Sequence, residues 1–170
     1  TDNLSAVLQY RLEEGSLDRL GVQCRRYIDS ISEDENVNLT KVCFVGNCTL
    51  DYIADAVRVG GARHGVLIDT VVGAYDQILQ ESLDPQSISN TASADIIFIH
   101  LDERNLPFEV APWDPGKANS SLDDVLELVR TVIASYKEKS SAQLIVSNVL
   151  PSLDALFGNL DQITPGSSRV

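Results

Sequence analysis

The sequence predicts a three-layer α/β fold built on a parallel β-sheet. Short apolar segments alternate four times with segments in which apolar residues recur at helical spacing. The apolar segments lack the alternation of a strand with one solvated face, so we expect both faces of the sheet to be covered. The chain has 170 residues, of which 44% are hydrophobic and 22% charged, and this fits one globular α/β domain.

A helical extension precedes the alternating pattern. Apolar residues recur at helical spacing over residues 4–12 and 17–31, with Gly15 between the two runs. We expect residues 1–38 to form a helical hairpin packed outside the main sheet. Residues 39–170 then form the α/β domain, which we expect to be incomplete at its C-terminus.

Four apolar runs are expected to be the strands, and they cover residues 41–46, 66–72, 95–101 and 143–147. Right-handed crossovers between consecutive parallel strands favour a sheet in the order 2-1-3-4, as in flavodoxin-like folds. Ligands of such sheets bind beyond the carboxyl ends of the strands, at the point where the strand order reverses.

Two helices are predicted between the first three strands. The first has Thr49 as its N-cap, and the glycines Gly60, Gly61 and Gly65 mark its end. A second, short helix is expected over residues 75–80.

A long loop and then the most regular helical pattern follow the third strand. Residues 102–120 contain three prolines, and a loop of this length is often functional. The helix is expected over residues 122–136, and Ser121 with Asp124 resembles its capping box. Residues 148–170 show little pattern.

Charge and composition exclude several classes of function. The net charge is −12, from 13 basic and 25 acidic residues, so a nucleic-acid backbone would be repelled. No apolar run approaches the about 20 residues of a membrane helix, and the first residues do not form a signal peptide. The cysteines Cys24, Cys43 and Cys48 match no zinc or redox spacing. We therefore expect a cytoplasmic domain with no metal, cofactor, nucleic-acid or membrane partner, and we expect Cys43 to be buried.

Polar clusters follow all four predicted strands. They are Gly46-Asn47-Cys48-Thr49, Gly73-Ala74-Tyr75-Asp76-Gln77, Asp102-Glu103-Arg104-Asn105 and Ser147-Asn148. Taken singly, each residue is better explained as a cap or turn residue, but together they predict a ligand site at one rim of the sheet. Backbone N–H groups at a helix N-terminus suit an anion or an oxyanion. The candidate ligand-binding residues are Gly46, Asn47, Thr49, Gly73, Asp76, Gln77, Asp102, Asn105 and Asn148.

Cys48 is the candidate nucleophile, because a helix N-terminus lowers the pKa of a thiol. Such a thiol needs a base, and the chain contains only His64 and His100. His64 lies at the far end of the helix after the first strand. His100, near the end of the third strand, is therefore the candidate catalytic base. The alternative is that Cys48 is a packed small residue.

Common nucleotide-binding and phosphoryl-transfer motifs are absent from these positions. The turn 46–49 is neither a P-loop nor a three-glycine Rossmann fingerprint. A response regulator would need an acidic pair there and an Asp in place of His100. A haloacid-dehalogenase-type (HAD-type) phosphatase would need Asp-x-Asp, which Asp102-Glu103-Arg104 does not provide.

Three stretches go beyond the general pattern of an α/β fold. Val42–Asp51 (VCFVGNCTLD), Gly73–Pro85 (GAYDQILQESLDP) and Ala94–Asp102 (ADIIFIHLD) resemble the N-terminal domain of FkbH-like proteins. The most specific parts are YDQ and LDP within the second stretch. The resemblance extends over roughly residues 40–158.

The resemblance implies an SGNH-hydrolase-like fold that precedes a HAD-type domain. It also implies that the full protein transfers a glyceryl unit from 1,3-bisphosphoglycerate to an acyl carrier protein in polyketide biosynthesis. The partners would then be the acyl carrier protein and the downstream HAD-type domain. Mg²⁺ is expected only in that second domain.

The resemblance also suggests roles for individual residues. Gly46-Asn47-Cys48 stands where SGNH hydrolases carry Gly-Asp-Ser, so that Cys48 replaces the nucleophilic serine. Gly73 stands at the glycine of the second block, an oxyanion donor, and the asparagine of the third block falls near residues 102–105. The fourth block, Asp-x-x-His, should follow a fifth strand, which we expect to lie beyond this chain.

Three functions remain open at this point. The first is an accessory domain that positions a carrier-protein arm or glyceryl group, for which Asn47, Cys48, Thr49, Asp76 and Asn105 should line one pocket. The second is a Cys-dependent acyl transferase or esterase that uses Cys48 and His100. The third is a docking module for an acidic carrier protein, with basic candidates Arg25, Arg26, Arg58, Arg63 and Arg104.

Overall fold

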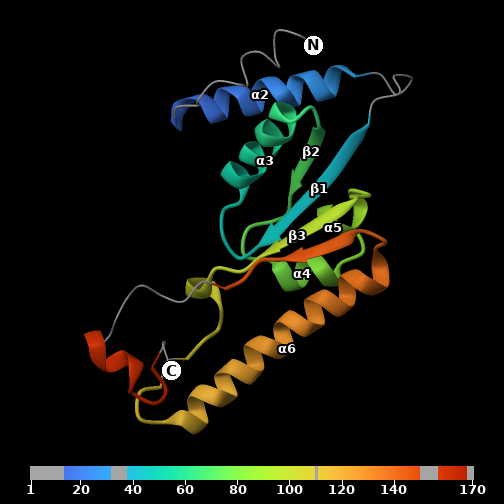
Figure 1. Cartoon of the computed structure of the whole chain (residues 1–170). Helices are drawn as coiled ribbons and strands as arrows, with labels where there is room; N and C mark the ends of the chain where they lie inside the picture. Colours follow the sequence, from blue (N-terminus) through green and yellow to red (C-terminus); the bar gives the residue numbers. More distant parts are fainter. Residues whose placement is uncertain (1–13, 32–37, 110, 150–156, 168–170) are drawn as a thin grey trace.

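The computed structural model describes residues 14–31, 38–109, 111–149 and 157–167, and it confirms the predicted α/β architecture (Figure 1). Its centre is a four-stranded sheet in the order β2-β1-β3-β4. The strands are β1 (Leu39–Gly46), β2 (Leu67–Val72), β3 (Ile96–His100) and β4 (Gln143–Val146). All three strand pairs are parallel, as predicted, so the carboxyl ends of the strands share one edge of the sheet. We call this the carboxyl edge.

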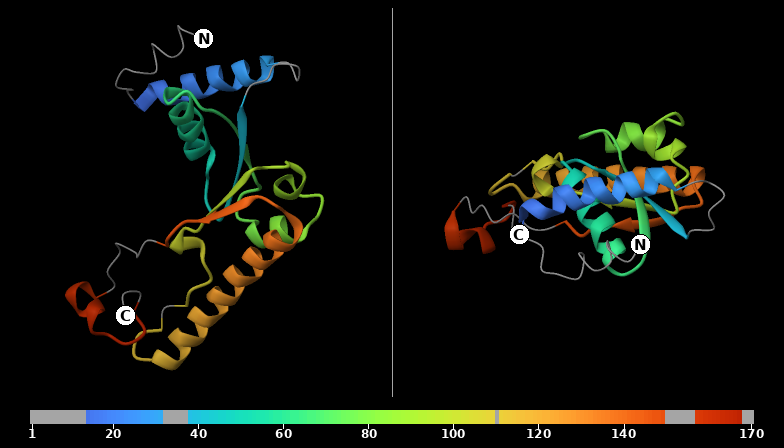
Figure 2. Two further views of the ribbon diagram at one scale, coloured as in Figure 1. Left: turned by 45° about the vertical axis from the view of Figure 1, so that its right-hand side comes forward. Right: turned by 90° about the horizontal axis from the view of Figure 1, so that it is seen from above.

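Helices lie on both faces of the sheet, which gives three layers (Figure 2). One face carries α3 (Asp51–Arg63). Ala54 of α3 and the preceding Leu50 pack against Phe44 of β1. The other face carries α4 (Ile78–Leu83), α5 (Ile88–Thr91) and α6 (Pro115–Lys139). The core beneath α4 and α6 includes the buried residues Cys43, Val45, Ile97, Ile99, Val132 and Tyr136. Cys43 is therefore buried as predicted.

The helix α2 (Glu14–Ser30) lies outside the main sheet and packs mainly on α3. Leu20 and Cys24 of α2 form a small buried cluster with Val59 of α3. This confirms the second helical segment of the predicted extension. The first segment, residues 4–12, lies outside the described residues.

Two predicted helix starts are wrong, and each has a local cause. Thr49 is not the N-cap of α3, because the helix begins at Asp51 after Leu50 and has no side-chain cap. The helix α6 begins at Pro115, well before the expected start, with the Asp114 side chain accepting a hydrogen bond from the Lys117 N–H. Asp at the N-cap followed by Pro is a strong start signal, but a polar first turn hides it from an analysis of apolar periodicity.

The early start of α6 shortens the long loop predicted over residues 102–120 and removes the capping box. Ser121 lies inside the helix and is buried, where its hydroxyl accepts a hydrogen bond of 2.6 Å from the Glu109 N–H. The loop also contains a short 3-10 helix, η1 (Glu103–Asn105). Ser121 therefore ties the loop to the helix rather than starting it.

Smaller boundaries also differ from the prediction. Gly60 and Gly61 lie within α3, and only Gly65, with φ of +73°, stands in the left-handed region beyond its end. The short helix expected over residues 75–80 is α4, which begins later because Asp76 occupies a turn with φ of +54°. The helix α5 and a 3-10 helix, η2 (Gly158–Gln162), had no apolar periodicity to predict them.

A buried carboxylate links α4 to the turn after β2 and to α5. Glu81 is only 7% exposed. Its Oε1 accepts from the Ala74 N–H at 3.0 Å, and its Oε2 accepts from the Ser89 hydroxyl at 2.8 Å and the Ser89 N–H at 3.2 Å. The Tyr136 hydroxyl of α6 donates to the same serine at 3.0 Å. Hydrogen bonding thus compensates the burial of this charge.

The described C-terminal segment returns to the start of α6. The Trp113 N–H donates to the Pro165 carbonyl at 2.8 Å, and the Ala111 N–H donates to the Gly166 carbonyl at 3.1 Å. Trp113 has φ of +70° and its side chain is 74% exposed. These bonds hold residues 111–114 against residues 164–167, away from the sheet (Figure 2).

Candidate functional site

The turn after β1 reaches the carboxyl edge through a close approach of two backbones. Gly46 pairs with His100 across the ladder. A Cβ at Gly46 would lie 2.5 Å from the His100 carbonyl oxygen, so only glycine fits without a backbone shift. Gly46 therefore has a structural role that is sufficient to explain it.

The Asn47 side chain joins this turn to the turn after β3. It is 2% exposed. Its Nδ2 donates to the Asp102 carbonyl at 2.8 Å, and its Oδ1 accepts from the Asp102 N–H at 2.7 Å. The Asn105 side chain donates to the Asn47 carbonyl at 2.6 Å. The structure thus brings Asn47, Asp102 and Asn105 together, and we call this group the asparagine clamp.

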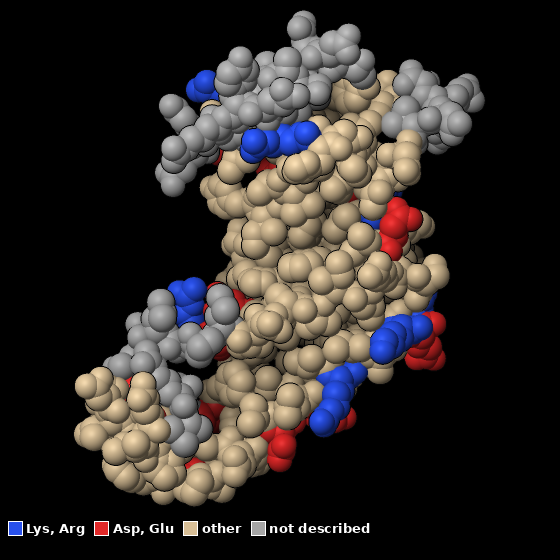
Figure 3. All heavy atoms as spheres, in the orientation of Figure 1, with Lys and Arg blue, Asp and Glu red and all other residues tan. Residues whose placement is uncertain are grey.

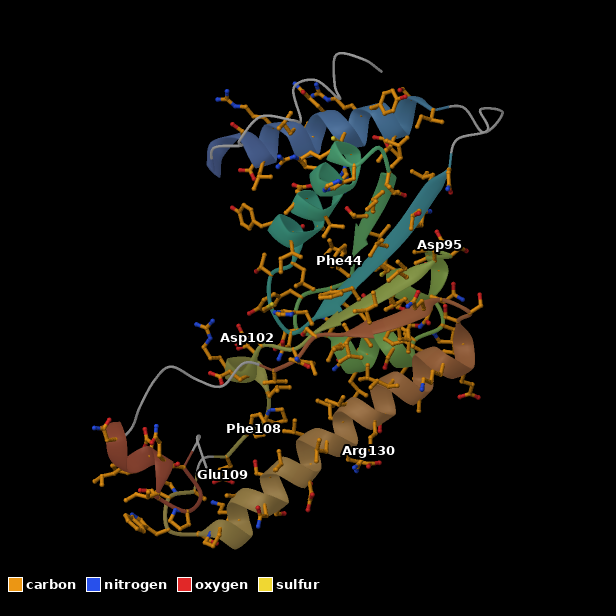
Figure 4. The ribbon with its side chains drawn as sticks, viewed as in Figure 1. Phe44, Asp95, Asp102, Phe108, Glu109 and Arg130 are labelled. Carbon is orange, nitrogen blue, oxygen red and sulfur yellow. The ribbon has the colours of Figure 1, made fainter. Side chains whose placement is uncertain are left out.

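The Asp102 carboxylate is hydrogen bonded to Arg104 of η1, whereas its backbone contacts Asn47. It accepts hydrogen bonds from the Arg104 N–H at 3.0 Å, from its Nε at 3.2 Å and from its Nη2 at 3.2 Å. The Arg104 contacts, with a smaller contribution from nearby His100, hold the pKa of the Asp102 carboxyl below its usual range. Figure 4 shows Asp102 and Asp95 at opposite ends of β3.

Cys48 lies beside Asp102 in an environment that disfavours its thiolate. Partial burial raises the pKa of the Cys48 thiol, the negative charge of Asp102 raises it further, and Arg104 offsets part of this shift. The helix N-terminus was expected to lower it. In the described part of the chain no hydrogen bond joins Cys48 to His100, whose Nδ1 lies 3.0 Å from the Ser147 hydroxyl.

The turn after β2 contributes less to the carboxyl edge than predicted. The Gly73 N–H donates to the Phe44 carbonyl at 2.8 Å, and the next N–H, of Ala74, donates to Glu81. Both amides are thus engaged inside the fold. Asp76 and Gln77 are exposed, and among the described residues no hydrogen bond links them to the asparagine clamp.

The N-terminus of α3 keeps unpaired backbone donors. Within the described ranges, the N–H groups of Cys48 and Thr49 donate to no protein acceptor, and no side chain caps the helix. Thr49 is exposed. Free N–H groups and the positive end of the helix dipole suit an anionic group. This part of the predicted site is therefore available for a ligand.

Ser147 was placed in the fourth polar cluster of the predicted site but was not among the candidate ligand or catalytic residues. Its hydroxyl contacts His100 Nδ1 and also accepts from the Leu101 N–H at 3.3 Å. The adjacent ends of β3 and β4 were the available signal, because parallel neighbours bring their last residues together. Asn148, a predicted ligand residue, follows it and is exposed.

Charges do not form a basic docking patch on the face drawn in Figure 3, where blue and red groups are interspersed. Arg58, one of the basic docking candidates, is 1% exposed and pairs with Asp55 and Thr70 inside the fold. It is unavailable to a partner.

Groups of three or more residues able to hold a metal are absent from the described ranges. None of the described helices is long and apolar enough to cross a membrane.

Comparison with known proteins identifies relatives of this chain. The family described as the FkbH N-terminal domain matches residues 41–168. No curated protein matches. A solved structure, the N-terminal part of the Bacteroides fragilis protein BF1531 containing a phosphatase domain and complexed with Mg, is similar with a TM-score of 0.64 at 19% identity. That similarity covers 87% of this chain and 38% of the other, and it concerns the fold alone.

Proposed function

Because the chain belongs to the family of FkbH N-terminal domains, we propose that it is the accessory domain of an FkbH-type protein. In this proposal the full protein moves a glyceryl unit from 1,3-bisphosphoglycerate to an acyl carrier protein in the cytoplasm. The domain positions the phosphate-bearing partner, either the carrier-protein arm or the phosphoglyceryl group, and a HAD-type domain with Mg²⁺ carries out the chemistry.

The observation that carries this proposal is the fixed turn at the N-terminus of α3. The asparagine clamp holds residues 46–48 in place, and the N–H groups of Cys48 and Thr49 have no acceptor among the described residues. Rigid donors at the positive end of a helix bind a phosphate at little cost in conformational entropy. A domain that only positions a phosphate-bearing partner needs such donors and no catalytic side chain.

The Cys-dependent alternative has less support. A nucleophilic thiol needs a lowered pKa or an adjacent base, whereas Asp102 and burial raise the pKa of Cys48. His100, the candidate base, is hydrogen bonded to Ser147 instead. Burial and the Asp102 charge thus disfavour a thiolate at this side chain.

The test is glyceryl loading of an acyl carrier protein by the full-length protein, followed by intact-protein mass spectrometry. Thr49→Glu places a negative charge beside the free N–H groups, and we expect about a tenfold loss of loading through KM. Gln143→Glu adds the same charge at the amino end of β4, where Gln143 is exposed, and should leave loading unchanged.

Three outcomes would decide between the hypotheses. Cys48→Ser keeps the backbone donor and should retain glyceryl loading within about threefold. If Cys48 were the nucleophile, the same variant would lose loading on the order of a hundredfold or more. Equal loading by Thr49→Glu and Gln143→Glu would remove the positioning role. A full-length protein that loads no glyceryl unit at all would remove the wider proposal.

A further inference from the structure

His100, the last residue of β3, and Ser147, the residue that follows β4, form a serine–histidine pair at the carboxyl edge. Ser147 follows the ladder pair Ile99 and Val146, and its N–H still donates to the Ile99 carbonyl at 2.9 Å. The Ser147 side chain therefore lies beside His100, on a backbone that the sheet holds in place. Its Oγ is 3.0 Å from His100 Nδ1.

The Ser147 hydroxyl has two hydrogen-bond partners, the Leu101 N–H and the His100 ring. The Leu101 N–H donates to Oγ at 3.3 Å, so a lone pair of the hydroxyl is occupied there. With the ring proton of His100 on Nε2, Nδ1 accepts the hydroxyl proton of Ser147. A serine that donates to an imidazole nitrogen has the arrangement of an activated nucleophile and its base.

The histidine ring is oriented by an aromatic neighbour. Phe98 lies two residues earlier on the same face of β3, and its ring is nearly parallel to that of His100, with 12° between the planes and 6.3 Å between centroids. Ile145 of β4 is the ladder partner of Phe98 and is 39% exposed. Phe98 and Ile145 thus form an apolar surface next to the pair.

The pair is accessible and has amide donors nearby. His100 and Ser147 are half-buried, and Asn148 is exposed. In the described ranges, neither the N–H nor the side-chain amide of Asn148 has a hydrogen-bond partner. A donor directly after a nucleophile can stabilise the oxyanion of an acyl-transfer step.

We propose that Ser147 and His100 form a nucleophile–base pair that cleaves small acyl thioesters and esters at the carboxyl edge. The Oγ of Ser147 forms a bond to the carbonyl carbon while its proton moves to Nδ1 of His100. The bond to the leaving thiol or alcohol breaks, and this group takes the proton from His100. Water then cleaves the acyl-serine with the same histidine as base, so that the net products are a carboxylic acid and a thiol or alcohol. This activity does not rest on the proposed glyceryl transfer.

The experiment uses the 170-residue chain alone, without carrier protein. A fluorophosphonate reagent should label Ser147 with loss of fluoride, and peptide mass spectrometry locates the label. Hydrolysis of acetyl-N-acetylcysteamine is followed by thiol release. We expect His100→Gln to slow both reactions by about a hundredfold. Ser30→Ala, a distant control whose hydroxyl donates to the Tyr27 carbonyl, should leave both unchanged.

A purely structural role for Ser147 predicts a different result. It gives no labelling of the folded wild-type chain, while Ser147→Ala lowers the thermal midpoint because the Leu101 N–H loses its acceptor. That outcome, or labelling that is independent of His100, overturns the proposal. Ser147→Cys keeps a nucleophile in place and guards against a folding defect: its thiol should be alkylated by iodoacetamide faster than Cys48.

Discussion

The Asn47 side chain and the Asp102 backbone exchange two hydrogen bonds across the carboxyl edge, at 2.8 and 2.7 Å. The amide of Asn47 behaves as an additional peptide group, because it donates to a carbonyl and accepts from an N–H. The turns after β1 and β3 are joined in this way although the two residues are 55 positions apart. The two turns are therefore held in place by the sheet and by each other.

Replacement of Asn47 by Ala should destabilise the domain by about 2 kcal/mol or more. The change leaves an N–H and a carbonyl of Asp102 without partners, and it also leaves a small cavity. Urea denaturation measures the effect. The matched control is Asn148→Ala, because Asn148 is exposed and should change the free energy of unfolding by less than about 0.5 kcal/mol. Equal effects of the two variants would contradict the role of the asparagine clamp.

Two glycine-to-alanine replacements should have opposite signs. A Cβ at Gly46 would meet the His100 carbonyl at 2.5 Å, so Gly46→Ala should destabilise by about 1–3 kcal/mol. A Cβ at Gly60, in the interior of α3, has nothing within 4 Å. Gly60→Ala should therefore stabilise by about 0.5–1 kcal/mol through helix propensity. Thermal unfolding of both variants checks the pair, and the same sign for both would refute the assigned geometry.

The strand order could be predicted from the sequence because it depends on local patterns and one general rule. Continuous apolar runs identify buried parallel strands, and right-handed crossovers restrict how they are arranged. The start of α6 could have been read from Asp114 and Pro115, but its first turn is polar and carries no periodicity. Helix starts are thus set by caps that hydrophobic patterns do not reveal.

The site was predicted in location more than in detail. The carboxyl edge follows from topology, so Asn47, Asp102 and Asn105 were expected to meet, and they do. Whether a side chain of this set hydrogen bonds within the protein or stays free for a ligand depends on distances that no local sequence pattern encodes. Asn47 was predicted to bind ligand, yet both its side-chain nitrogen and its side-chain oxygen are hydrogen bonded to the Asp102 backbone. Ser147 belonged to the fourth polar cluster but was not a candidate catalytic residue, because its partner His100 is 47 positions away.

Glu81→Gln should destabilise the fold although it preserves size and shape. Both carboxylate oxygens of Glu81 accept hydrogen bonds, from Ala74 and from Ser89. A glutamine must turn its NH₂ group toward one of these N–H donors, which leaves a buried donor unpaired at about 1–3 kcal/mol. Urea denaturation provides the measurement. Glu127→Gln is the control. Glu127 is 74% exposed and its ion pair with Arg130 is long, at 3.9 Å, so this change should have almost no effect on the free energy of unfolding. A neutral result for Glu81→Gln would show that the buried carboxylate is not required.

The reactivity of Cys48 should respond in opposite directions to its two charged neighbours. Burial and Asp102 raise the pKa of its thiol above the ordinary value of 9.0, so at pH 8 it has less thiolate than an unfolded cysteine. Iodoacetamide should therefore alkylate it more slowly in the folded chain than in urea, with a rate that continues to rise above pH 9. Asp102→Asn removes a charge that raises the pKa and should speed alkylation. Arg104→Gln removes one that lowers the pKa and should slow it. Peptide mass spectrometry separates Cys48 from Cys43, whose pKa is raised to about 12 by burial and which should stay unmodified. A folded Cys48 that reacts faster than the unfolded one would restore the Cys-dependent mechanism, because it would require a thiolate that this electrostatic environment does not favour.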